Sequence, residues 1–286
     1  MAYTNAQNKV VSDLLYTGIQ EQSKTPYFYN TQWSAEAADA KQVTIVNVGD
    51  VTIATYAPNN DMTPTQGSPS ATVLSIDTFK SFFVTLDQTE KLVGDQLSAL
   101  ASKGSVKCAL AADASALALA TKANFPTNWY AGSSDAAVNV NTANVLDIID
   151  SLGENLDATN VPESDRFIIV PPKLNTKILR AMKESGLSLM PVENALLKRP
   201  GSYNIGGFTI INSNQYVEVT GSGTHDFKIL YGSANAIAAA YTAPIVESGR
   251  LEKQFGDYVK GLFRYGMKVL DETQGGAAYL NVVADS

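Results

Sequence analysis

Two segments with strand-like patterns and a long helical pattern follow one another along residues 43–121. Apolar and polar residues alternate over 43–57, and residues 72–86 are rich in β-branched and aromatic residues. A stretch rich in Pro, Asn, Gly and Ser separates them, and a proline-free run with helical periodicity follows. The pattern predicts an extended hairpin and then one long helix. Because a two-stranded hairpin is at best marginally stable alone in water, it has to rest on its own domain or on another copy of the chain.

The predicted helix begins after Asp87, a candidate N-cap with Glu90 at the capping-box spacing. A helix of about 34 residues would be roughly 50 Å long, well above the usual mean. Gly94 and Gly104 interrupt the pattern, and we predict that at Gly104 the helix bends or is approached closely by a strand. One apolar face repeats at three- and four-residue steps: Val93, Leu97, Leu100, Gly104, Cys108, Ala111, Ser115 and Leu119.

The segments on either side of this region differ from it in pattern. Residues 1–42 hold a cluster of aromatics without a regular period, so we expect an arm whose aromatics dock on a neighbouring surface. Residues 123–142 have the composition of a loop, and a helix is expected to start near Thr142 or Asn144. Its inward residues are predicted to be Val145, Ile148, Ile149 and Leu152.

Residues 166–172 predict a short apolar strand stopped by two prolines, and 173–186 predict an amphipathic helix ended by Gly186. The inward face of this helix is expected to hold Leu174, Ile178, Leu179 and Met182. The rest of the chain is β-rich, with apolar segments between glycine turns. Because strands and helices are mixed without an internal repeat or a regular βαβ rhythm, the predicted fold class is α+β.

The composition is that of a folded protein with part of its surface covered. A chain of 286 residues can bury a real core, in one large domain or two small ones. Its 45% hydrophobic and 17% charged residues suggest that other subunits hide some of the surface. No apolar run reaches the roughly 20 residues of a membrane helix, and the first residues lack the blocks of a signal peptide. The single cysteine fits a reducing cytoplasm.

The charge balance argues against tight binding of nucleic acid. There are 21 basic and 28 acidic residues, and the formal net charge is −7. Nucleic-acid-binding proteins usually carry a basic patch, whereas no basic run here is longer than Lys198-Arg199. An acidic surface would let DNA slide past without sticking.

The chain is poor in the residue types that catalysis uses. Its one histidine, His225, would have to serve any Ser-His-Asp arrangement, with Asp226 or a distant acid, but its context favours a solvated hairpin turn. Cys108 lies on the apolar helix face, where a cysteine behaves as a small buried hydrophobe rather than a nucleophile. We therefore predict no catalytic residues and no enzyme activity.

Signals for metals, cofactors and phosphates are equally weak in the sequence. Asp147 and Asp150 lie three apart on a predicted helix, as do many solvated acid pairs, and no zinc or calcium spacing occurs. The glycine clusters in 205–208 and 220–224 lack the phosphate-loop ending and indicate turns. Charges of mixed sign near the C-terminal strands suit cross-strand or inter-subunit ion pairs: Glu252, Lys253, Asp257, Lys260 and Arg264. We expect no cofactor and no metal, and the pattern favours a structural role.

An ordered set of segments carries a family resemblance over most of the chain beyond the arm. In order these are VGDVTIATY, LSIDTFKSFFVTLDQTEK, ALAADASALALA, DRFIIVPPKLNTKIL, NIGGFTIINSN and AIAAAYTAPIVESGRLEKQFGDYVKGLFRYGMKVLDE. The set resembles the major capsid proteins of tailed bacteriophages with the HK97-type fold. No single motif is diagnostic, but the ordered set is fairly specific.

The resemblance implies an assignment of parts. The N-terminal arm would be 1–42, lying along a neighbour, and the extended E-loop would be 43–87, reaching over an adjacent subunit. The peripheral domain would comprise 88–122, with the spine helix, and 244–269. The axial domain, around fivefold and sixfold axes, would comprise 123–243 and 270–286. Truncating the predicted E-loop tip, 59–70, is expected to weaken shells without unfolding the subunit.

The resemblance also implies a function and partners. Many copies would form the pentamers and hexamers of an icosahedral shell that encloses double-stranded DNA without sequence-specific binding, assembled in the bacterial cytoplasm and found in the virion. The other partners that the resemblance implies are a portal protein and a decoration protein, and no contact with a membrane is expected. A separate scaffolding protein is implied because no long segment precedes the arm, unless the chain has already been trimmed. No Lys–Asn pair for covalent cross-linking can be placed.

Two other functions stay open on the sequence. An encapsulin-like nanocompartment shares the fold, and portal and terminase genes nearby would favour the phage function over it. An enzyme or ligand-binding domain would use His225 and nearby acids.

Overall fold

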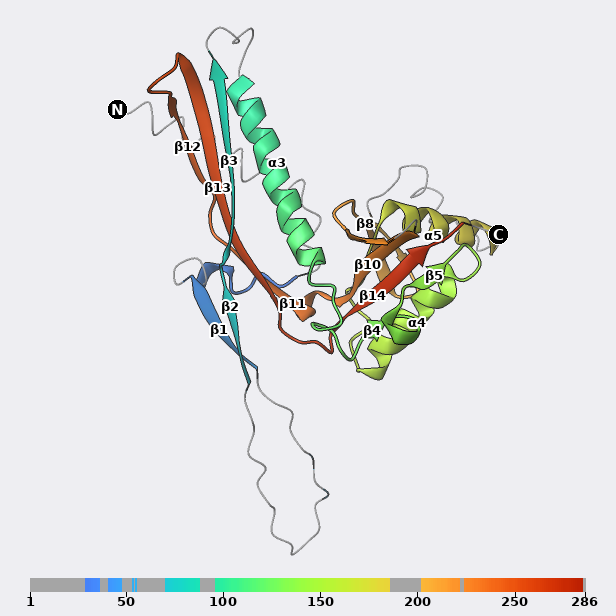
Figure 1. Cartoon of the computed structure of the whole chain (residues 1–286). Helices are drawn as coiled ribbons and strands as arrows, with labels where there is room; N and C mark the ends of the chain where they lie inside the picture. The colour runs from blue at the N-terminus through green and yellow to red at the C-terminus, as the bar shows by residue number, and fades with distance from the viewer. Residues whose placement is uncertain are drawn as a thin grey trace, which may run out of the picture.

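The computed structural model describes residues 29–36, 41–47, 53, 55, 70–87, 96–185, 202–221 and 224–284, with only the backbone at 96, 202, 217–221, 224 and 225. These residues form two bodies (Figure 1). An elongated body contains the long helix α3 and the strands around β13, and a rounded body contains α4 and α5 against a second sheet. The mixture of sheets and helices confirms the predicted α+β class.

The described part of the rounded body contains an eight-stranded mixed sheet. Its path is β4 (Trp129–Tyr130), β14 (Gly275–Val282), β10 (Thr224–Ser233), β6 (Arg166–Val170), β8 (Phe208–Asn212) and β7 (Ser202–Ile205). Off this path, β5 (Val138–Val140) pairs with β14, and β9 (Val217–Gly221) pairs with β10. β6–β8, β14–β4 and β14–β5 are parallel, and the other pairs are antiparallel.

Two helices cover one face of this sheet as the apolar periodicity predicts. α4 (Val145–Ala158) buries all four predicted residues, and α5 (Pro172–Glu184) buries Leu174, Ile178 and Met182, with Leu179 half-buried. They share one core with alternate residues of β6, β8, β10 and β14. β6 is buried along its whole length, which explains its continuous apolar run. The predicted stop at Gly186 lies outside the described residues.

In the elongated body β13 (Gly256–Val269) is the central strand. It pairs antiparallel with β3 (Thr78–Asp87) on one side, and with β11 (Ile237–Tyr241) and β12 (Ile245–Arg250) on the other. α3 (Gln96–Leu117) lies along one face of this four-stranded sheet (Figure 1). Cys108 and Ala112 of α3 pack there on Phe263 and Tyr265 of β13.

The prediction at Gly104 is confirmed. A Cβ added there would lie 2.8 Å from the ring of Phe82 on β3, and one added to Gly261 of β13 would lie 2.3 Å from the same ring. Phe82 therefore fits between two glycines, and the close approach of β3 to the helix depends on their missing side chains.

The expected extent of the long helix is only partly confirmed. Residues 88–95 lie outside the described residues, which leaves the caps at Asp87 and Glu90 untested. The described helix ends at Leu117 rather than at 121. The Ala-rich sequence carries no stop signal there, but Phe125 is fully buried after a turn closed by hydrogen bonds from Ala120 to Leu117 and from Asn124 to Leu119. Tertiary burial thus overrides helix propensity.

The prediction of one continuous strand over 72–86 is wrong. β2 (Ser70–Ser75) pairs antiparallel with β1 (Gln42–Asn47), whereas β3 pairs with β13. At the break the chain crosses β13 at Gly266, where an added Cβ would lie 1.8 Å from the carbonyl oxygen of Ser75. The first strand ends at Asn47 and Ile53 lies in no strand, and most of the rest of 43–57 and of the tip lies outside the described residues.

The aromatics of the predicted arm dock on their own chain in the described segment 29–36. Asn30 bridges Ala238, donating its amide to the Ile237 carbonyl at 2.8 Å and accepting from the Ala239 amide at 2.9 Å. Tyr29 is buried and Trp33 packs beside Ala238. These residues therefore dock on the edge of β11, which is distant along the sequence and offers unpaired backbone groups, and an arm lying along a neighbouring subunit stays a prediction. Residues 1–28 lie outside the described part.

Candidate assembly surfaces

The residues considered for catalysis are dispersed. His225 lies in β10 with its backbone opposite Thr220 of β9, and its side chain is not described. Asp226 accepts a hydrogen bond from the Tyr279 hydroxyl at 3.2 Å. Cys108 is buried between α3 and β13, as predicted, and this burial raises the pKa of its thiol against the opposing influence of Lys80. A buried thiol with a raised pKa is a poor nucleophile.

The other candidate groups lie at ordinary structural positions. Asp147 and Asp150 are exposed on α4, and Gly206 and Gly207 form the β7–β8 turn with φ of 55° and 80°. Within the described ranges, no three His, Cys, Asp or Glu side chains come close enough to hold a metal ion. Nor is any helix in that part of the chain long and apolar enough to cross a membrane.

The face of the four-stranded sheet opposite α3 carries exposed apolar side chains. Phe79 and Phe83 of β3 are each 59% exposed, and Ile245 of β12 is 43% exposed. The register places Arg264 beside Phe79 and Lys260 beside Phe83. We call this surface the open sheet face; it comprises Phe79, Phe83, Ile245, Glu247, Tyr258, Lys260, Leu262 and Arg264.

Charged groups on the open sheet face are paired across strands. Lys260 lies directly opposite Glu247, with 2.6 Å between Nζ and Oε2, and this hydrogen bond raises the pKa of Lys260. Tyr258 lies beside both Lys260 and the Phe83 ring, whose centroid is 5.6 Å from that of Tyr258. The predicted cross-strand ion pair is confirmed for Lys260, although Glu247 was not among the predicted members. The face therefore presents exposed phenylalanines among polar and charged side chains, of which Lys260 and Glu247 pair with each other.

β3 also has an unpaired edge within the described structure, where it pairs only with β13. A ten-residue edge strand with exposed phenylalanines is a template for association, and natural proteins usually cover such edges. Sequence reasoning missed the open sheet face because the pattern in 79–84 does not say which aromatics face the helix. The alternation about Phe82, which packs on α3, is the signal that assigns Phe79 and Phe83 to the other face.

The paired strands β1 and β2 have one packed face and one bare face. Leu74 and Ile76 are buried on Ala238 and Ala240, with Val43 beside them. On the opposite side Val46 is 62% exposed and Val73 is 41% exposed. β1 and β2 therefore pack with one face on their own chain and expose apolar side chains on the other face. The pair is set apart from the rounded body (Figure 1).

Comparison with known proteins then identifies the fold. No protein-family model and no curated protein matches this chain. A solved structure from Mycobacterium phage Che8 matches with 20% identity and a TM-score of 0.71, covering 90% of this chain and 91% of that chain. The capsid of cyanophage Pam1 matches with 13% identity and a TM-score of 0.68, covering 91% and 92%. The chain has a phage capsid fold.

A third match supports the same conclusion. The capsid of cyanophage P-SCSP1u has 15% identity and a TM-score of 0.65, covering 86% of this chain and 84% of that chain. The resemblance to phage major capsid proteins is thus confirmed in the fold, at identities where the sequences have diverged widely. In this capsid fold the open sheet face and the bare face of β1–β2 both expose large apolar side chains.

Proposed function

We propose that this chain is a major capsid protein whose copies assemble into pentamers and hexamers of an icosahedral shell. The observation that carries the proposal is the capsid fold together with the open sheet face, where two phenylalanine side chains lie exposed on the face that α3 does not cover. Fully burying one such side chain is worth about 1.5–3 kcal/mol. Repeated at every contact in a shell, this supplies a strong drive toward association.

The two uncovered surfaces suit a contact between different parts of neighbouring copies. The open sheet face lies on β3, β12 and β13, and the bare face lies on β1 and β2, so the proposed contact joins different surfaces of two copies. Contacts of this heterologous kind generate rings when the rotation closes. We infer that the extended β1–β2 segment of one copy covers the open sheet face of the next, in keeping with its assignment to the E-loop.

The shell would enclose phage double-stranded DNA without reading its sequence. The net charge of −7 disfavours tight DNA binding, so DNA would be confined rather than bound. A separate scaffolding protein, a portal protein and a decoration protein are the proposed further partners, with assembly in the host cytoplasm. The role is structural rather than catalytic, and His225→Ala is expected to leave assembly unchanged.

The test is assembly of the purified full-length chain, alone and with the scaffold encoded near it. Electron microscopy and light scattering are expected to show closed shells built from fivefold and sixfold clusters. A protein that stays monomeric under all assembly conditions would contradict the proposal.

A further inference from the structure

Chain segments that connect the two bodies lie against one another at a single place. In the described structure these are the α3–β4 connection, the β10–β11 connection and the β13–β14 connection. The Ser233 amide donates to the Gln274 carbonyl at 2.9 Å, and the Leu270 amide donates to the Ala236 carbonyl at 2.9 Å. The last two connections are therefore hydrogen-bonded to each other directly.

Asn128 joins the first connection to the others. It is 1% exposed, and its side-chain amide donates to the carbonyls of Thr273 at 2.8 Å and of Gly275 at 3.0 Å. Its backbone carbonyl accepts from the Tyr231 hydroxyl at 2.8 Å and from the Ala277 amide at 3.2 Å. One buried asparagine thus uses both amide hydrogens and its carbonyl to hold strands of the rounded body against the β13–β14 connection.

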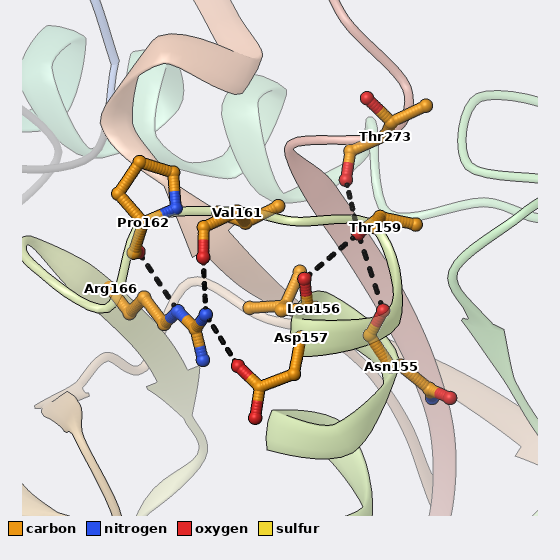
Figure 2. A network of polar contacts seen from close by, with 8 residues as sticks. All are labelled: Asn155, Leu156, Asp157, Thr159, Val161, Pro162, Arg166 and Thr273. Atoms are coloured by element: carbon orange, nitrogen blue, oxygen red, sulfur yellow. Dashed lines mark hydrogen bonds and ion pairs between the residues drawn. The ribbon is translucent and has the colours of Figure 1, made fainter.

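The end of α4 meets the same carbonyl (Figure 2). The Thr159 hydroxyl lies 3.1 Å from the Thr273 carbonyl oxygen, and it also lies 3.1 Å from that of Leu156. Because a hydroxyl has one hydrogen to donate, Thr159 serves one of these carbonyls at a time and cannot replace Asn128.

A buried arginine holds the segment that follows Thr159. Arg166, with a side chain 4% exposed, donates to the carbonyls of Val161 and Pro162 and pairs with Asp157 at 2.7 Å (Figure 2). These bonds connect the last turn of α4, the loop after it and the start of β6. The position of Thr159 is therefore fixed from within the rounded body.

Three glycines allow the chain segments to approach one another closely at this place. A Cβ added to Gly275 would lie 2.8 Å from Phe125, and one added to Gly276 would lie 2.3 Å from the Tyr231 ring. Gly232 has φ of 139°, and a Cβ there would lie 2.5 Å from the Gly275 backbone. β10, β14 and Phe125 of the α3–β4 connection are therefore closely packed at this place, and opening it would break the buried hydrogen bonds of Asn128.

We propose that this cluster is a rigid joint and that Asn128 is its positioning residue, fixing the angle between the two sheets and thereby the curvature of the assembled shell. The first half of this statement concerns the isolated chain, and the second half rests on the proposed function. Without the Asn128 amide the Gly275 carbonyl loses this donor, and the Thr273 carbonyl is left with the Thr159 hydroxyl, which it shares with Leu156; leaving buried carbonyls short of donors is costly. The joint would then open more often than the cores on either side of it.

Hydrogen exchange of the full-length chain tests the joint. We compare Asn128→Ala, Asn128→Asp and the control Asn204→Ala, which replaces an exposed asparagine of β7 whose side chain accepts from the Thr209 hydroxyl at 3.1 Å. In Asn128→Ala the amides of Ser233, Leu270 and Ala277 are expected to exchange about tenfold faster, with β6 unchanged, because the cost is local. Asn128→Asp keeps the size of the side chain but places a carboxylate against two carbonyls. Exchange at these three amides is therefore expected to be faster still than in Asn128→Ala.

Slower exchange in Asn128→Asp than in Asn128→Ala would overturn the rigid joint, because it would mean that Asn128 is needed only for its volume. A uniform rise in amide exchange over the whole chain in Asn128→Ala would also overturn the rigid joint. This test does not need Asn128→Asp, so it still decides if that variant fails to fold.

Electron microscopy of assembled particles tests the curvature. Asn128→Ala is expected to broaden the distribution of shell diameters at a temperature where the subunit remains folded, whereas Asn204→Ala leaves it as in the wild type. If shells of Asn128→Ala are as uniform in diameter as those of the wild type, the proposal that the joint sets the curvature of the shell is overturned. A wild-type chain that forms no shells would refute the proposed function, while the exchange measurement would still decide the joint.

Discussion

The eight-stranded sheet and the four-stranded sheet use the same alternation of apolar residues with different results. In the rounded body, α4 and α5 cover one face, and alternate residues of β6 and β10 on the other face pack with the end of α3 and with β11. In the elongated body α3 covers one face, while Phe79 and Phe83 stay exposed on the other. The difference teaches that apolar alternation shows a face will be covered, but not by which chain.

This contrast separates folding from assembly. Substitutions in the rounded body should act on the stability of the subunit, because its partners are within the chain. Substitutions on the open sheet face should act on association and leave the subunit folded.

The largest loss of stability is expected in the rounded body. Phe208 of β8 is fully buried among residues of α4 and β6. Phe208→Ala is expected to lower the free energy of unfolding by about 3–5 kcal/mol, since it removes apolar contacts and leaves a cavity. Urea unfolding of the unassembled chain measures it, with the exposed Phe79→Ala as the control. Equal losses in the two variants would break the comparison.

A smaller loss is expected at the covered face of the elongated body. Gly261→Ala places a Cβ against Phe82, which Gly104 confines from the other side, and overpacking of this kind costs about 1–3 kcal/mol. Adding Phe82→Leu should recover part of the loss, and thermal unfolding measures both variants.

Gly153→Ala on α4 is the matched control for this substitution. Its nearest neighbour, Phe208, would be 3.6 Å from the new Cβ, an ordinary contact. It is expected to stabilise by about 0.5–1 kcal/mol through helix propensity. A loss of stability at Gly153→Ala equal to that at Gly261→Ala would mean that close packing on Phe82 is not the cause.

Alkaline pH should weaken both bodies together. Burial raises the pKa of Tyr231 in the rounded body and of Tyr241 and Tyr265 in the elongated body above the ordinary value of 10.0, because the phenolate is disfavoured there. The unfolded chain ionises first, so this stability is fully present below pH 10 and falls as the pH rises toward the folded-state values. Tyrosinate absorbance should rise for exposed tyrosines first and for the buried ones together with unfolding. Ionisation of all tyrosines near pH 10 in the folded chain would contradict this.

The sequence was sufficient where the apolar pattern of one element decides by itself which of its residues are buried. The buried faces of α4 and α5, the strand β6, the buried Cys108 and the close approach at Gly104 all follow from local periodicity and residue size. In each case the apolar stripe marks which side of the element is buried, whatever segment covers it.

The sequence was insufficient where a distant strand decides. The change of partner between β2 and β3, the docking of Tyr29 beside β11 and the Lys260–Glu247 pair depend on sheet register, which local patterning does not carry. For the same reason the candidate surface could not be assigned in advance, because the exposure of Phe79 and Phe83 requires knowing that Phe82 faces α3.

Replacing the two exposed phenylalanines tests most directly whether the open sheet face serves assembly rather than folding. In Phe79→Ser with Phe83→Ser, the free energy of unfolding of the unassembled chain should stay within about 0.5 kcal/mol of the wild type, as for exposed substitutions in general. A control with Lys103→Ser and Lys107→Ser, on the exposed side of α3, should assemble normally. Sedimentation of assembly reactions is predicted to show shells for the wild type and the control and free subunits for the phenylalanine variant. Shells of that variant at wild-type yield would contradict the account.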